Sequence, residues 1–212
     1  MVESNILNEV SKKEINAEIL AKKVIKNPRS LPDIMEGFLS DAANIRFKSA
    51  KILVLISKEK SELLLPYFNF FAGHLGNKNT ILKWNAMDVI SNLAPADSEK
   101  KFDKLFKKFY SMLYEGSLIT AAHVVEGSAI IANTKPYLEE KITQEILKIG
   151  KIPLPSEECR NILKGHAIKA FDQYFDQSRS KDKIIDFVRK ELNNTRNATR
   201  KKAEKFLKKW ER

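Results

Sequence analysis

Two groups of residues in the sequence could do chemistry. The first is Glu157-Glu158-Cys159 with His166, which joins the only cysteine of the chain to a histidine seven residues later. On a helix this spacing places Cys159 and His166 on one side, roughly 10 Å apart along the axis. A shared metal ion would then need a ligand from another segment, and the compact ligand spacings of zinc sites are absent. We expect both side chains to be structural.

The second group is His123 with Glu126, three residues apart in another segment of helical periodicity. Glu126 occupies a position that is apolar in the related segments described below. Such a local inconsistency can mark a functional residue or a half-exposed edge position, and both interpretations stay open. A general base needs a nucleophile or a polarised substrate close by, and the sequence offers no candidate.

The remaining composition favours a protein without catalytic chemistry. No glycine-rich phosphate loop, nucleophile elbow or paired-carboxylate motif occurs, so we predict no enzyme activity, cofactor or metal. A single cysteine excludes an intramolecular disulfide framework. The first thirty residues lack the apolar run of a signal peptide, and no apolar stretch is long enough to cross a membrane. We therefore expect a cytoplasmic protein.

The elements that would position these residues repeat along the chain. Alanines recur 36 residues apart, with one step of 45 that nine extra residues, GKIPLPSEE, explain; they are Ala50, Ala86, Ala122, Ala167 and Ala203. Apolar residues recur three positions later, at Leu53, Val89, Val125, Ala170 and Phe206. A further apolar column lies twenty positions after the alanines, at Phe70, Phe106, Ile142 and Phe187. These columns indicate a structural repeat.

Each repeat predicts two helices. The first helix carries apolar residues at i, i+3, i+4 and i+7 spacing, and an alanine lets a neighbouring helix approach closely. Breaker segments follow at 57–61, 94–98, 132–136 and 176–180. Pro66 and Pro136 fall near the start of two second helices, where a missing N–H costs least. The stretch KILVLIS resembles a strand, but its place in the repeat predicts a helix.

This pattern resembles the HEAT and armadillo superfamily, over about residues 42–192. The resemblance implies an all-α fold, a right-handed α-solenoid of about five to six antiparallel helix hairpins. We predict one domain over 1–212. It would comprise a capping hairpin over 1–40, four repeats over 41–192 with a loop insertion near 150–158, and a basic capping helix over 193–212.

The basic charge is concentrated at one end. The net charge is +11, and residues 179–212 hold 13 Lys or Arg against 5 Asp or Glu. The segment can be a capping helix whose outer face is polar because no repeat follows it. That role does not explain why the charge is positive, so the alternative is a docking surface for nucleic acid or an acidic partner. The candidate contacts are Arg189, Lys190, Arg196, Arg200, Lys201, Lys202, Lys205, Lys208 and Lys209.

Two functions follow from these expectations. The first is a non-catalytic scaffold that holds another protein. The second is a nucleic-acid-binding protein related to the HEAT-like DNA glycosylases for alkylated bases, although their motif is not matched residue by residue. A lyase-type HEAT protein has no supporting residues. The positions of seven basic residues discriminate between the two functions: one concave face shared with the C-terminal cluster would favour nucleic acid, and a scatter over the outside would favour the scaffold. They are Lys107, Lys108, Lys141, Lys148, Lys183, Arg189 and Lys190.

Overall fold

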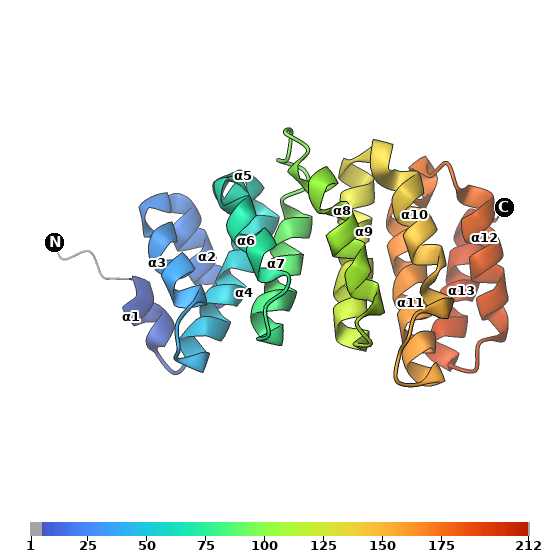
Figure 1. Cartoon of the computed structure of the whole chain (residues 1–212), viewed down its shortest axis with the longest axis horizontal. Coiled ribbons are helices and arrows are strands. Elements are labelled where there is room, and N and C mark those ends of the chain that lie inside the picture. Colours follow the sequence, from blue (N-terminus) through green and yellow to red (C-terminus); the bar gives the residue numbers. More distant parts are fainter. Residues whose placement is uncertain (1–5, 212) are drawn as a thin grey trace. The chain divides into compact units, whose positions relative to one another are not determined.

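The computed structural model describes residues 6–211, and every regular element among them is a helix (Figure 1). The chain divides into two compact units, Met1–Phe102 and Asp103–Arg212. Because every regular element of residues 6–211 is a helix, the predicted all-α class is confirmed. The prediction of one domain with its internal boundaries stays a prediction. No helix within residues 6–211 combines the length and the apolar character that crossing a bilayer requires.

The first unit contains helices of very different length. They are α1 (Ile6–Ser11), α2 (Ala17–Lys26), α3 (Leu31–Phe38), α4 (Ala43–Glu59), α5 (Ser61–Leu64), α6 (Phe68–His74) and α7 (Thr80–Asn92). Helix α4 is central, because it packs against α2, α3 and α7. It includes KILVLIS, so the helix predicted there is confirmed. Phe38 is fully buried and meets the rings of Phe70 and Phe71 edge-on.

Local sequence explains where these helices begin. The side chains of Asn16 and Asn79 accept hydrogen bonds from the first free N–H groups of α2 and α7, as N-cap residues do. Pro66 lies within the single 3₁₀ turn Leu65–Tyr67 just ahead of α6, and Pro136 begins the 3₁₀ turn Pro136–Leu138 ahead of α10. Both prolines therefore stand at the start of a second helix, as predicted.

The second unit has two rows of helices. The first row is α9 (Leu118–Thr134), α11 (Glu157–Tyr174) and α13 (Asn197–Trp210), in which α11 packs against both of the others. The second row includes α10 (Glu139–Leu147) and α12 (Lys181–Lys190), which pack on each other and on α9 and α13 respectively. Helix α8 (Lys101–Ser111) begins at the boundary between the units. Tyr110 of α8 is hydrogen-bonded to Ser128 of α9 at 2.9 Å.

Four of the five repeating alanines are fully buried, and in α9 the buried position is one residue earlier than predicted. Ala50, Ala86, Ala167 and Ala203 are fully buried. In α9 the fully buried residue is Ala121, and Ala122 is partly exposed. The first turns of α9 carry no charged side chain to mark an outer face, so the sequence did not determine how this helix is rotated.

The nine-residue insertion is anchored to the second unit. A short 3₁₀ turn, Ile149–Lys151, contacts α11, and Ile152 and Leu154 are buried after it. Ser156 then caps α11, because its Oγ accepts from the backbone N of Cys159 at 3.1 Å. The insertion thus adds apolar contacts beneath α11 and sets the first turn of that helix.

Candidate anion-binding groove

Helices α11 and α13 run parallel in close contact. Thr199 Oγ1 donates to the carbonyl of Asn161 at 2.8 Å near their starts, and Lys209 Nζ lies 2.8 Å from Asp172 Oδ1 near their ends. Contacts that advance together along both helices mean that the helices point the same way. This direction is expected of the first helices of two successive repeats.

A glycine permits the close approach. A Cβ atom at Gly165 would lie 2.9 Å from Thr199 Oγ1 and 3.2 Å from Lys202 Nζ. Thr199 cannot easily move aside, since it is buried and its hydroxyl is bonded to Asn161. The Lys202 side chain is consequently laid over the backbone of α11.

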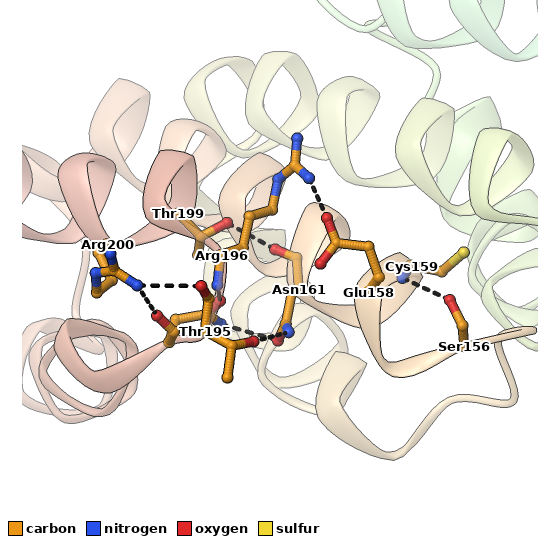
Figure 2. A network of polar contacts seen from close by, with 9 residues as sticks. Ser156, Glu158, Cys159, Asn161, Thr195, Arg196, Thr199 and Arg200 are labelled. Atoms are coloured by element: carbon orange, nitrogen blue, oxygen red, sulfur yellow. Dashed lines mark hydrogen bonds and ion pairs between the residues drawn. The ribbon is translucent and has the colours of Figure 1, made fainter.

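The turn ahead of α13 is held by a polar network, which Figure 2 shows. Asn161 Nδ2 donates to Thr195 Oγ1 at 2.9 Å, and its Oδ1 accepts from Asn194 Nδ2 at 2.9 Å. Arg200 donates to the carbonyls of Asn194 and Thr195 at 2.7 and 3.1 Å. Arg196 pairs with Glu158. These contacts determine the position of α13 on α11.

The predicted basic residues fall into two groups by their partners. Four of them form ion pairs or hydrogen bonds within the protein: Arg196 and Arg200 as above, Arg189 with Asp186 and Glu211, and Lys209 with Asp172. The others form no ion pair with any of residues 6–211; they are Lys190, Lys201, Lys202, Lys205 and Lys208.

Two of these lysines lie in one hollow with Lys169, which was not among the predicted contacts. Lys202 and Lys205 of α13 and Lys169 of α11 line one hollow of about 310 Å³, together with Ile168, Asp172 and Phe206. Lys169 also forms no ion pair within residues 6–211. Lys169 lies outside the basic C-terminal run, so the charge pattern gave no signal for it.

The surroundings of Lys202 disfavour its protonated form. Burial lowers the pKa of Lys202, and the neighbouring Lys169 and Arg196 lower it further, against a smaller opposite effect of Glu126. A lowered pKa in the folded state means that the protonated lysine disfavours folding below that pKa, and that this cost fades as the pH rises through it. Lys202 is nevertheless exposed to solvent, which screens most of this effect.

Glu126 and His166 form one pair across α9 and α11. His166 Nδ1 and Glu126 Oε1 are 2.9 Å apart and hydrogen-bonded. By sequence spacing alone, Glu126 was grouped with His123, and His166 with Cys159. Cys159 instead lies in the first turn of α11, and in Figure 2 it takes part through its backbone N alone. Among residues 6–211 no group of three or more His, Cys, Asp or Glu side chains could hold a metal ion.

We expect the alanine variant of His166 to raise the pKa of Glu126. The hydrogen bond from His166 is the main cause that lowers this pKa, ahead of the charges of Lys169 and His123. Losing it should move the pKa back toward that of an ordinary glutamate, which a carboxyl ¹³C NMR titration would follow. His123→Ala should raise it less, because His123 acts only through charge. An unchanged pKa in the His166 variant would contradict the pairing.

The chain is thus an all-α protein in which a hollow between two parallel helices is lined by three lysines that form no ion pair within residues 6–211. No protein-family model matches the chain, and no curated protein matches it.

Proposed function

We propose that the protein is a non-catalytic interaction scaffold, an α-solenoid of HEAT-like helix pairs that holds an acidic partner protein. Support for the repeat comes from contacts that recur between first helices. Ser57 of α4 accepts from Asn92 of α7, 35 residues later, and Glu126 of α9 meets His166 of α11, 40 residues later. Similar separations in each unit are typical of stacked repeats.

The observation that carries the acidic partner is the unequal neutralisation of the basic residues. Lys169, Lys202 and Lys205 converge on one hollow and lack an acidic partner among residues 6–211, whereas Arg189, Arg196 and Lys209 are paired. Three like charges brought together repel one another, and Lys202 is also desolvated. A ligand carboxylate would offset the repulsion, because its negative charge attracts all three ammonium groups.

The basic residues of the other row support a protein partner more than a nucleic acid. Lys148, the C-cap residue of α10, pairs with Glu145 at 2.8 Å, and Arg189 of α12 lies 3.7 Å from Asp186. Acidic side chains therefore interrupt the basic residues on these helices. A groove that tracks a phosphate backbone needs an unbroken basic path.

Charge reversal should test the function. In the full chain, Lys169→Glu, Lys202→Glu and Lys205→Glu together are expected to weaken binding of polyglutamate about tenfold or more, measured by fluorescence anisotropy across salt. The matched control reverses three exposed lysines of the other row, Lys141, Lys183 and Lys190, and should retain most of the affinity.

Three results would contradict the proposal. Equal weakening by both triple variants would show that only net charge matters. Absence of polyglutamate binding would remove the acidic partner. Tighter, strongly salt-dependent binding of duplex DNA or single-stranded RNA, lost in the groove variant, would establish the nucleic-acid function in its place.

A further inference from the structure

The hollow between α11 and α13 has an apolar floor beneath its charges. Ile168 and Phe206 line it, and each is only 2% exposed. The side chains of α11 that face it are spaced i, i+1 and i+4, and those of α13 are spaced i, i+3 and i+4, so each helix contributes one continuous stripe. The aliphatic stems of the lysines add apolar wall above the floor. A ligand would meet hydrocarbon below and ammonium groups at the rim.

A carboxylate of the protein itself, Asp172, lies at one end of the hollow. Asp172 lines it, and its Oδ1 accepts from Trp210 Nε1 at 2.6 Å while it also pairs with Lys209. Lys209 lies over the ring of Trp210, 4.4 Å from its centroid. A ligand carboxylate is therefore attracted more strongly to the Lys169, Lys202 and Lys205 rim than to the Asp172 end, where Asp172 and Lys209 neutralise each other. This asymmetry gives a bound chain a preferred direction.

The floor does not offer what a nucleic acid uses. Bases bind by stacking on exposed aromatic faces, and the only ring that lines the hollow, Phe206, is buried against Phe175 with centroids 5.1 Å apart. An aliphatic group needs no ring face, and it would contact the lysine stems as well as the floor. Its volume, about 310 Å³, is at the small end for ligand pockets and suits one side chain rather than a large molecule.

We infer that this hollow binds a short acidic segment of the partner, with one large aliphatic side chain on Ile168 and Phe206 and flanking carboxylates on Lys169, Lys202 and Lys205. This inference rests on the proposed function and specifies the partner surface. The carboxylates supply charge, which steers association, and the aliphatic side chain supplies the buried area that holds the complex.

The test uses the full chain and three labelled peptides of equal length, of which the first two carry the same charge. One peptide has acidic residues on both sides of a single leucine, a second has serine in place of leucine, and a third has the leucine flanked by neutral residues. Burying one leucine predicts an affinity for the first peptide on the order of tenfold higher than for the second. The neutral peptide should bind more weakly than both.

The outcomes separate this inference from the proposed function. Equal affinity for the leucine and serine peptides would overturn the inference and leave an acidic partner standing. Failure of both acidic peptides and of polyglutamate would overturn the two together. Displacement of the leucine peptide by single-stranded RNA, but not by polyglutamate, would assign the hollow to nucleic acid.

NMR would locate the peptide without changing the core. The methyl resonances of Ile168 should shift on addition of the leucine peptide, and those of Ile184, buried in α12, should not. Lys202→Met keeps an apolar stem but removes the charge, so it should weaken binding severalfold while the melting temperature stays equal or rises. Lys208→Met is the control, since Lys208 does not line the hollow. Unshifted Ile168 methyls with intact binding would place the peptide elsewhere.

Discussion

Glu139→Ala is expected to destabilise the second unit by about 3 kcal/mol, because it removes the acceptor for three donors, two of them buried. Glu139 is 3% exposed at the start of α10. Its Oε1 accepts from Thr143 at 2.8 Å and from Ser178 at 2.6 Å, and its Oε2 accepts from the backbone N of Arg179 at 3.1 Å. Urea denaturation followed by circular dichroism would measure the loss.

The neighbouring glutamate is the matched control. Glu140 is exposed on the same turn of α10, so Glu140→Ala should change the free energy of unfolding by no more than about 0.5 kcal/mol. Ser178 also accepts from the backbone N of Ser180, one residue before α12 begins. The Glu139 variant should therefore lose hydrogen-exchange protection first in α12. Equal stabilities of the two variants would contradict this role.

Gly37→Ala should destabilise the first unit by about 2 kcal/mol, as overpacking does. A Cβ at Gly37 of α3 would collide with Ser49 Oγ of α4 and lie 2.8 Å from Leu7 Cδ2 of α1. The better helix propensity of alanine, about 1 kcal/mol, offsets only part of that cost. Thermal unfolding monitored at the aromatic side chains of the first unit would report the change.

Two comparisons make this prediction specific. Gly73 lies in α6 with nothing within 4 Å of an added Cβ, so Gly73→Ala should be neutral or stabilise by up to about 1 kcal/mol. Ser49 Oγ is buried without a hydrogen-bond partner among residues 6–211. Ser49→Ala should therefore cost nothing and should rescue most of the Gly37→Ala loss in a double-mutant cycle. Simple additivity of the two changes would show that the clash is absent.

The repeat step was enough to predict most helix positions. The spacing of Ala50 and Ala86 predicted α4 and α7, and the nine-residue insertion correctly moved the next first helix to α11. Periodicity works here because apolar and charged residues alternate around those helices. In α9 nearly every residue up to Val125 is uncharged, so the pattern predicted a helix but not the side that it buries.

The groove was only partly predictable from the sequence. The charge run predicted Lys202 and Lys205, but Lys169 lies outside that run, between Ile168 and Ala170. Its role depends on α13 lying against Gly165, which is a property of two helices and not of either one. The same limit applies to Glu126 and His166, whose hydrogen bond joins residues from two different helices, α9 and α11.

The parallel register of the first helices also bears on how the binding surface is made during synthesis. Asn161 and Thr199 are 38 residues apart, and Asp172 and Lys209 are 37 apart, so each helix needs only the preceding repeat in order to dock. Chains with such local contacts fold readily from the N-terminus as they leave the ribosome. The Lys169 side of the groove then exists before the Lys202 side. Under the proposed function, an acidic partner would recognise the surface only after the ribosome has released α13.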